Sequence, residues 1–202
     1  MDSFETLWDY RSQVRALYQR MRDAQTLENT DPLEIHQEFC KARDQLFQHH
    51  PQSALAADQK RHFQHLEYFA YSPDLRFLLS IDLNIKPEIL EFQISEGTVR
   101  AQRFGKVQFA VSGVPYSLSL FWLLGYGGGV FLPFGDTTNG HETYGGGRYL
   151  LDTIKHADLG HVGDLIVIDF NYAYNPRWSC PLTPLENRLG VGIEAGEKVF
   201  LE

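Results

Sequence analysis

The chain has 202 residues, of which 43% are hydrophobic, so it is long enough for one domain with a full hydrophobic core. Its formal net charge of −8 argues against a nucleic-acid partner, because a broad nucleic-acid footprint needs lysine and arginine gathered on one face. No apolar run approaches about 18 residues, so the sequence predicts no membrane-spanning helix and no membrane partner.

The N-terminal residues and the cysteines indicate a cytoplasmic protein. Met1 is followed by a charged stretch rather than by the basic and apolar regions of a secretory signal. The two cysteines, Cys40 and Cys180, lie far apart, in segments predicted to differ in structure. This arrangement argues against a disulfide framework and fits a reducing compartment.

The first helix is predicted from the spacing of its apolar residues. Leu7, Tyr10, Val14, Leu17 and Met21 recur at alternating spacings of three and four, which places them along one helical face. We expect this stripe either to cover its own domain or to pair with a second copy of the chain in a homodimer.

A second helix follows at once. Asp31 suits the N-cap, Pro32 suits the first helical position, and Pro51 ends the helix. A short third helix is predicted within residues 53–66, before Pro73. The histidines of this region, His62 and His65 among them, are predicted to lie on the surface, and we expect no metal site.

From Leu75 onward, the hydrophobic period changes towards two. All 17 glycines lie at or after Gly97. Turns at Glu96-Gly97, Ser112-Gly113 and Asn139-Gly140 separate short apolar strands, and Leu165 to Phe170 forms one more. The chain is therefore predicted to be α+β. An N-terminal helical segment (1–70) packs on an antiparallel meander (71–202) that closes into a β-barrel or sandwich, as one compact unit.

A glycine-rich segment occurs twice, at Tyr126 to Leu132 and at Tyr144 to Leu150, and the second copy carries Arg148. Three consecutive glycines weaken a strand, so each copy predicts a tight bend or a close approach. Arg148 offers a planar fork of donors for an anion, with the backbone of Gly145, Gly146 and Gly147 beside it. The alternative is an internal ion pair with Asp136, Glu142 or Asp169.

Further candidate residues follow the glycine-rich segment. Asp169 and Asn171 are two apart at the end of a strand, so both point to one face. Asp169 is a candidate general base, metal ligand or partner of Arg148, and the alternative is that both residues tie down the next loop. Cys180 is predicted to be structural. Glu186 is an acid/base candidate, or a group that satisfies the backbone.

Aromatic residues in the meander suggest a further place for a ligand, although aromatic residues at strand spacing usually form a core. They are Phe104, Phe109, Tyr116, Phe121, Trp122 and Tyr126.

Several sequence blocks resemble domain-of-unknown-function family 1684, a group of bacterial and archaeal proteins. The blocks are Phe131 to Thr138, Glu142 to Leu150, Asp169 to Asn171, Ala173 to Pro176, Cys180 to Leu182, Glu186 to Leu189 and Ala195 to Lys198. Gly135 stands where family members often carry arginine, and the loop before Cys180 is shorter and lacks a further cysteine. The resemblance implies a shared fold and site and brings no established activity.

We expect one polar pocket that binds a small anionic molecule and that needs no organic cofactor. Its walls would be the second glycine-rich segment, the Asp169 strand end and the loop from Cys180 to Asn187. The predicted binding residues are Arg148, Tyr144, Gly145, Gly146, Gly147, Asn171, Asn175, Cys180 and Asn187. If the protein is an enzyme, Asp169 or Glu186 would move a proton in a hydrolase-like or lyase-like reaction.

Two alternatives to this pocket stay open. One is a non-catalytic β-barrel that holds an apolar or amphipathic ligand among its aromatic residues. The other is an interaction module that uses its N-terminal helix.

Overall fold

Three helices precede the strands, as the sequence predicts. The computed structural model describes residues 3–25, 30–94, 97–176 and 181–200. Its helices are α1 (Phe4–Ala24), α2 (Pro32–His49) and α3 (Ala57–His62). Asp31 caps α2 as expected, because its side chain accepts a hydrogen bond from the Leu33 amide at 2.9 Å. The helix α3 is shorter than predicted, because Phe63 turns to extended backbone and is buried beside Phe47.

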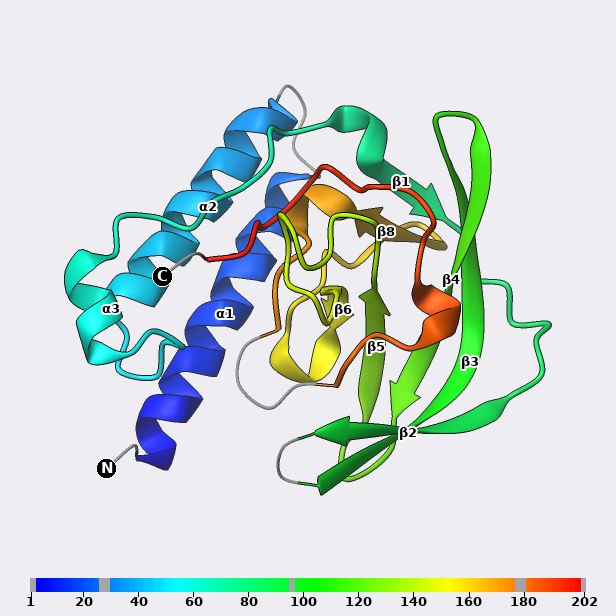
Figure 1. Ribbon diagram of the computed structural model, residues 1–202, viewed down its shortest axis with the longest axis horizontal. Helices are drawn as coiled ribbons and strands as arrows, with labels where there is room; N and C mark the ends of the chain where they lie inside the picture. Colours follow the sequence, from blue (N-terminus) through cyan, green and yellow to red (C-terminus); the bar gives the residue numbers. More distant parts are fainter. Residues whose placement is uncertain (1–2, 26–29, 95–96, 177–180, 201–202) are drawn as a thin grey trace.

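The strands form two antiparallel sheets, so the fold is α+β (Figure 1). The larger sheet contains, in chain order, β2 (Glu88–Ile94), β3 (Gly97–Val111), β4 (Val114–Leu123), β5 (Gly129–Phe134) and β6 (Arg148–Asp152). The smaller sheet has the order β1 (Arg76–Leu79), β8 (Leu165–Asp169) and β7 (His161–Val162). The pairings within the two sheets leave both of them open, so the predicted barrel is not confirmed. The segment from Leu165 to Phe170 is a strand, as predicted, but it belongs to the smaller sheet.

Positive backbone φ angles mark the predicted turns. Ser112 and Gly113 have φ of 50° and 80° and connect β3 to β4, which matches a two-residue hairpin turn. Gly140 has φ of 82° and lies inside the longer connection between β5 and β6. The predicted turn at Glu96-Gly97 lies partly outside the described residues, but β2 and β3 pair on both sides of it.

The two glycine-rich segments have different structural roles. Gly127 and Gly128, with φ of 88° and 58°, form the short turn between β4 and β5. A Cβ atom on Gly128 would lie 2.5 Å from the Trp122 indole nitrogen, so this turn needs glycine for space as well as for conformation. The second segment instead ends a long loop and leads into β6 at Arg148.

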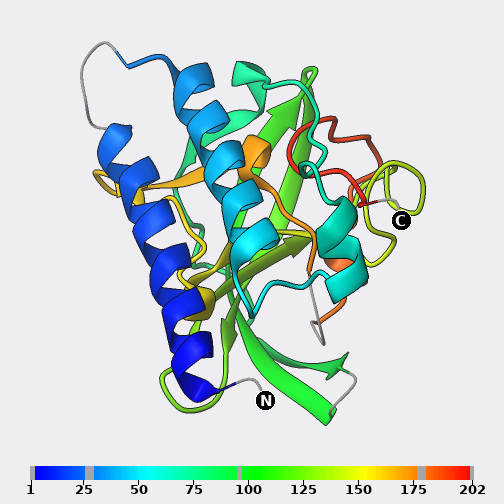
Figure 2. The same cartoon turned by 90° about the vertical axis from the view of Figure 1, so that its left-hand side faces the viewer.

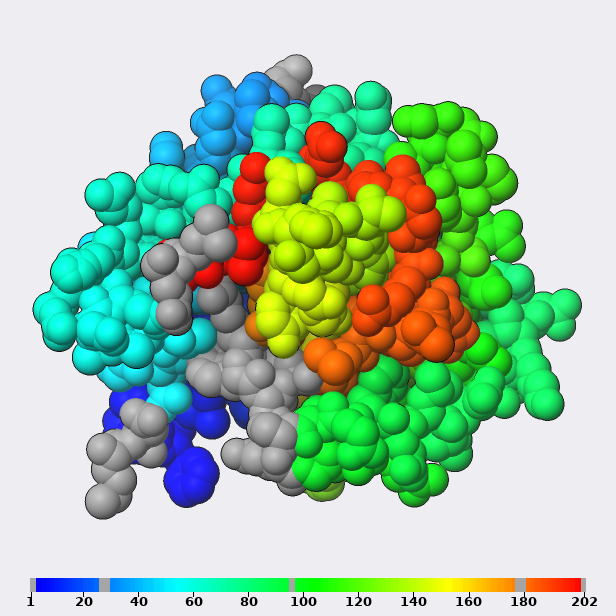
Figure 3. Space-filling view, in the orientation of Figure 1, coloured from blue at the N-terminus to red at the C-terminus, as the bar shows by residue number. Residues whose placement is uncertain are grey.

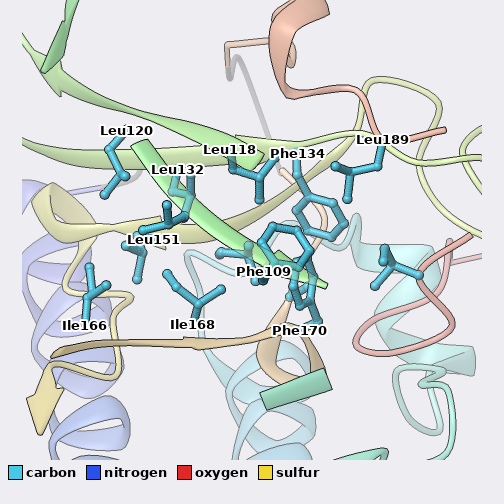
Figure 4. Close-up of a cluster of buried hydrophobic side chains, with 14 of the residues drawn as sticks. Phe109, Leu118, Leu120, Leu132, Phe134, Leu151, Ile166, Ile168, Phe170 and Leu189 are labelled. Atoms are coloured by element: carbon cyan, nitrogen blue, oxygen red, sulfur yellow. The ribbon is translucent and has the colours of Figure 1, made fainter. Parts of the chain in front are cut away.

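A hydrophobic core lies between the two sheets, and Figure 4 shows its side chains pointing towards one another. Leu118, Leu132 and Phe134 come from the larger sheet. Ile168 comes from β8 of the smaller sheet, and Phe170 is the first residue after β8. All five are at most 1% exposed. Burial of each such side chain stabilises the folded protein by about 1.5–3 kcal/mol relative to leaving that side chain exposed. Of the aromatic residues named above, Phe109 and Phe121 are buried in the core, whereas Trp122 and Tyr126 are exposed.

A second cluster joins the helices to the smaller sheet. Leu17 and Met21 of α1 and Phe39 of α2 pack against Val167 of β8 and Tyr172. Figure 2 shows α1 and α2 side by side across one side of the molecule, with the strands behind them. The C-terminal half of the predicted α1 stripe therefore covers its own domain. A homodimer through the N-terminal helix stays a prediction.

The C-terminal segment (residues 189–200) runs between the helices and the strands. Its backbone amides at Glu197 and Lys198 donate hydrogen bonds of 2.8 Å to Ala173 and Glu67. On the face shown in Figure 3, the yellow-green loop before β6 lies beside the orange and red C-terminal residues. The Leu189 amide donates to the Gly135 carbonyl, which fixes that contact. The segment thus joins both halves of the molecule.

None of the helices within the described ranges is both long and apolar enough to cross a membrane.

Candidate functional site

Arg148 lies at the start of β6, where it forms a buried ion pair. Its Nη2 atom donates to Asp136 Oδ2 at 2.8 Å, and both side chains are 0% exposed. The same nitrogen donates to the Ile193 carbonyl at 2.8 Å, and Nη1 donates to the Ala195 carbonyl. The Phe134 ring lies 5.0 Å from the guanidinium. Arg148 therefore has an internal ion-pair partner. Of the three candidate carboxylates, Asp136, Glu142 and Asp169, that partner is Asp136.

This ion pair is held in low-dielectric surroundings. Burial lowers the pKa of Arg148, and the charge of Asp136 opposes that shift. Asp136 Oδ1 also accepts hydrogen bonds from the amide and hydroxyl of Thr138, at 2.8 and 2.5 Å. The guanidinium thus anchors the C-terminal segment to β5 and β6 and offers no open face to a ligand.

The glycines before Arg148 serve the backbone of the same region. The Gly147 amide donates to the Tyr144 carbonyl at 3.0 Å, and the Gly146 carbonyl accepts from the Thr183 amide at 3.1 Å. Gly147 has φ of 94°. A Cβ atom there would lie 2.7 Å from the Phe134 carbonyl oxygen and would overlap the Thr183 hydroxyl.

Gly147→Ala is expected to destabilise the protein by about 2–4 kcal/mol, since the side chain adds both a strained φ and a clash with backbone. Gly140→Ala is the matched control. Gly140 has a similar φ of 82°, but a Cβ atom there would meet nothing within 4 Å, so only the conformational cost of about 1 kcal/mol remains. Urea denaturation measures both variants. Equal losses would show that close packing is not what requires glycine at position 147.

Two of the predicted binding residues satisfy buried backbone groups. Asn171 is 0% exposed; its Nδ2 donates to the Ser72 carbonyl and its Oδ1 accepts from the Ser72 amide, both at 2.8 Å. Asn187 is also 0% exposed, and it bonds the amide and carbonyl of Ser119 in the same way, at 2.8 and 2.9 Å. Asn171 therefore fastens the loop at Ser72 to the turn after β8, and Asn187 fastens its own loop to β4.

Glu186 lies over the larger sheet. Its Oε2 atom accepts from Arg103 Nη1 at 2.5 Å and from the Ser119 hydroxyl at 3.1 Å. Asp169 ends β8 in the smaller sheet, and the two carboxylates have no common hydrogen-bond partner within the described ranges. The structure therefore places the two acid/base candidates in separate surroundings.

Asp169 lines a pocket of about 240 Å³ with Arg76, Tyr71 and Tyr172. The residue is 4% exposed, and its Oδ1 atom accepts from the amide and from Nδ2 of Asn171, at 3.0 and 2.8 Å. Burial raises the pKa of Asp169 to about 6, although the hydrogen bonds from Asn171 and the charge of Arg76 act in the opposite direction.

The free energy of unfolding is expected to fall as the pH rises and the buried carboxyl group of Asp169 ionises. Its pKa is raised from 3.8 to about 6, so the folded protein binds this proton more tightly than the unfolded chain does. The stabilising contribution is complete below about pH 4 and is lost between about pH 4 and 6, with a size on the order of 2–3 kcal/mol. Urea denaturation of wild type and Asp169→Asn across this range isolates the effect. Parallel pH profiles would contradict the raised pKa.

The cysteines give no reactive thiol in the part of the chain that the structure describes. Cys180 lies outside the described residues. Burial raises the pKa of Cys40 to about 12, so its thiol is protonated at neutral pH. The neighbouring His36 is 4% exposed, and burial lowers its pKa, so the imidazole is neutral. Its Nε2 atom lies 2.9 Å from the Asn171 carbonyl oxygen.

An open groove of about 980 Å³ lies between α3 and the loop before β6, and His62, His65 and His141 line it. His62 and His65 are exposed, as the sequence predicts. Across the described ranges, no group of three or more histidine, cysteine, aspartate or glutamate side chains is placed to hold a metal ion.

A smaller cavity of about 160 Å³ lies between the helices and β6, and we call it the helix–sheet cavity. Its aromatic walls are Tyr10, Tyr18, Phe47, Tyr149 and Tyr174. Its cations are Arg11, Arg43 and Lys155, and Asn175 and several aliphatic side chains complete the lining. None of its described lining residues is acidic.

Asn175 is the one predicted binding residue that lines the helix–sheet cavity within the described ranges. Its Nδ2 atom donates to Glu197 Oε1 at 3.2 Å and to the Lys198 carbonyl at 2.7 Å. The other oxygen of Glu197 accepts from Arg43 Nη2 at 2.6 Å. The cavity is therefore backed by a second buried ion pair, between Arg43 of α2 and the C-terminal segment.

The sequence interpretation placed Tyr10 and Val14 only in an apolar stripe and missed their part in a cavity. Tyr10, Val14 and Tyr18 are spaced four apart on α1, so their side chains lie on one face. Two of these three carry hydroxyl groups, and Arg11 is adjacent. Phenol groups within a core-facing stripe are the signal that could have indicated a cavity with a polar lining.

Comparison with known proteins gives the family. Residues 61–198 match a family model described as a protein of unknown function, DUF1684. The solution NMR structure of an uncharacterised protein of Haloarcula marismortui is similar at 31% sequence identity and a TM-score of 0.55, and the match covers 82% of this chain and 93% of that chain. No curated protein matches the chain. Since the family model spans well over half of the sequence, the chain belongs to the family of unknown function DUF1684.

Proposed function

We propose that this protein binds a small anionic molecule with an apolar body in the helix–sheet cavity. The observation that carries the proposal is the charge of the described lining: three cations and no carboxylate, in a chain with a net charge of −8. A cavity whose charged groups all have one sign attracts ligands of the opposite sign. The proposal keeps the cytoplasmic location expected from the sequence.

The three cations differ in how far they are neutralised. Arg43 is paired with Glu197 at 2.6 Å, and Lys155 is paired with Asp152 at 3.1 Å. Arg11 is exposed and forms no ion pair with any described residue. One positive charge on the lining is therefore left for an anionic ligand.

The aromatic walls and the volume limit the size of the ligand. A dry cavity of about 150 Å³ accepts a molecule of the size of benzene. The hydroxyls of Tyr18 and Tyr174 are buried and lack a hydrogen-bond partner among the residues that the structure describes. Burial raises the pKa of Tyr18, so its hydroxyl remains a donor at neutral pH. A single ring or branched chain that bears a carboxylate fits these properties.

The lining supports binding better than turnover. No carboxylate or histidine is found among the described residues of the cavity wall, so the cavity offers hydrogen-bond donors without a general base. We therefore propose a binding function and assign no reaction to this cavity.

Titration of the protein with benzoate, followed by NMR, tests the proposal. We expect saturable shifts at Tyr10, Tyr18 and Tyr174, and weaker binding of the neutral isostere benzamide. Val14→Phe should abolish binding because the larger side chain fills the cavity. Arg11→Gln should weaken binding about two- to fivefold by removing the uncompensated charge.

Arg15→Gln is the matched control for Arg11→Gln. Arg15 is also exposed on α1 but does not line the cavity, so this change should leave benzoate affinity unaltered. The proposal is overturned if benzoate gives no saturable shift at the cavity residues up to about 10 mM, or if benzamide binds equally well.

A further inference from the structure

The Asp169 pocket is a second site, separate from the helix–sheet cavity. It lies where the C-terminal end of α1, the start of α2, β1 and β8 meet, and it encloses about 240 Å³. Asp169 and Arg76 supply its charged groups, Gln25 supplies an amide, and Ile35, Tyr71 and Tyr172 supply apolar surface. None of these six residues lines the helix–sheet cavity.

One oxygen of Asp169 is left without a hydrogen bond. Asn171 saturates Oδ1, whereas Oδ2 accepts no hydrogen bond from the part of the chain that the structure describes. The nearest cation is Arg76, whose Nε lies 3.8 Å from Oδ2, which is too far for a hydrogen bond. The side chain of Asp169 is 2% exposed. A carboxylate oxygen in such a position needs a donor, because a buried charge without one is costly.

Arg76 and Gln25 lie on the opposite side of the pocket, and one donor of this pair has no acceptor among the described residues. Arg76 Nη2 donates to Gln25 Oε1 at 3.0 Å, which fixes the orientation of the amide. The Nε2 atom of Gln25 is then buried and finds no partner among the described residues. The Arg76 side chain is 27% exposed, so it can adjust towards a ligand.

We propose that this pocket binds a small zwitterion, namely an α-amino acid with an apolar side chain. Its ammonium group would donate to Asp169 Oδ2, and its carboxylate would accept from Arg76 and from Gln25 Nε2. Its side chain would pack against Ile35 and the rings of Tyr71 and Tyr172. Because the formal charges of Asp169 and Arg76 cancel, a ligand with one charge of each sign is favoured over a simple cation or anion.

The weakness of the internal ion pair supports this assignment. A carboxylate in a close salt bridge has a depressed pKa, but burial dominates at Asp169 and raises its pKa to about 6. Arg76 therefore compensates the buried carboxylate only in part. At neutral pH, the carboxyl group is mostly ionised and ready to accept from an ammonium group.

L-Valine and its two single-charge relatives provide the test. Isobutylamine is L-valine without the carboxylate, and isovalerate is L-valine without the ammonium group. NMR titration at pH 7.5 should give saturable shifts at Tyr71, Asp169 and Tyr172 for L-valine, and binding at least about tenfold weaker for each relative at these residues. Equal binding of isobutylamine, or no saturable shift with L-valine, would overturn the zwitterion proposal.

Two variants and two controls localise the effect. Asp169→Asn and Arg76→Gln should each weaken L-valine binding at least about tenfold, because each removes one charged contact. The controls change ion pairs that do not line the pocket. Asp158→Asn removes the charge that pairs with Arg22, and Arg100→Gln removes the charge that pairs with Glu91. Both controls should leave L-valine affinity unchanged. Unaltered affinity in Arg76→Gln, which changes a partly exposed side chain, would also contradict the proposal.

Arg11→Gln separates this inference from the proposed function. It should weaken benzoate binding in the helix–sheet cavity and leave L-valine binding unaltered, so either site can fail while the other is retained.

Discussion

Replacing Arg148 by methionine is expected to lower the free energy of unfolding by about 3–5 kcal/mol. The change leaves Asp136, whose side chain is 0% exposed, as a buried charge without its cation. It also deprives the Ile193 and Ala195 carbonyls of their donor, which loosens the C-terminal segment. Chemical denaturation followed by circular dichroism and fluorescence gives the loss.

A double-mutant cycle separates the charge from the packing. Asp136→Asn in the Arg148→Met background removes the unpaired charge, so we expect it to recover part of the lost stability. Arg100→Met is the exposed control; its Nε lies 3.9 Å from Glu91, and its loss should cost less than about 1 kcal/mol. If Arg148→Met cost no more than this control, Arg148 would not be the internal anchor that the contacts indicate.

Arg43→Met is expected to cost a similar amount, about 3–5 kcal/mol. The guanidinium of Arg43 bonds Glu197 at 2.6 Å and the Tyr68 hydroxyl at 3.1 Å, and the Phe47 ring lies 5.3 Å away. Methionine keeps much of the packing volume but removes the cation that bonds Glu197, whose side chain is 0% exposed.

Glu197→Gln in the Arg43→Met background tests the cause. If the carboxylate that has lost its cation is responsible, the double variant should be more stable than Arg43→Met alone. Arg22→Met is the partly exposed control, since its pair with Asp158 is about a quarter exposed on both sides. Thermal and urea denaturation give these values. A double variant no more stable than Arg43→Met would assign the loss to packing instead.

The sequence predicts well those elements whose signals are local. Asp31 and Pro32 mark the start of α2, and Ser112-Gly113 marks a hairpin turn, because cap and turn conformations depend on the residues at those positions. The pairing of β5 with β6 was also expected. In each case, the interacting residues are near one another in the chain or joined by a recognisable turn.

The sequence does not predict which strands pair over long separations. Leu165 to Phe170 was placed in a single meander, yet β8 pairs with β1, where Leu79 is opposite Ile166. Hydrophobic periodicity shows that a strand has a buried face but carries no information about its neighbour. The two separate sheets therefore could not be derived from the apolar pattern alone.

The same limit applies to the candidate site. The sequence left three carboxylates open as partners of Arg148, and only the fold identifies Asp136. Asn171 and Asn187 were expected to bind a ligand, and the structure shows both of them bonded to backbone groups. Tyr18 and Tyr174 come together across more than 150 residues of chain, which residue spacing does not indicate.

The two buried arginines have a consequence for the order of assembly. Arg43 and Glu197 are 154 residues apart in the chain, and Arg148 bonds carbonyls 45 and 47 residues further on. On the ribosome, α2 and β6 emerge before the segment that supplies Glu197 to Arg43 and the carbonyls of Ile193 and Ala195 to Arg148. Contacts of such separation close late because they require a large loss of chain entropy. A nascent chain that ends before residue 193 thus lacks the carboxylate that pairs with Arg43 and the two carbonyls that accept from Arg148, although Asp136, the ion-pair partner of Arg148, is already present.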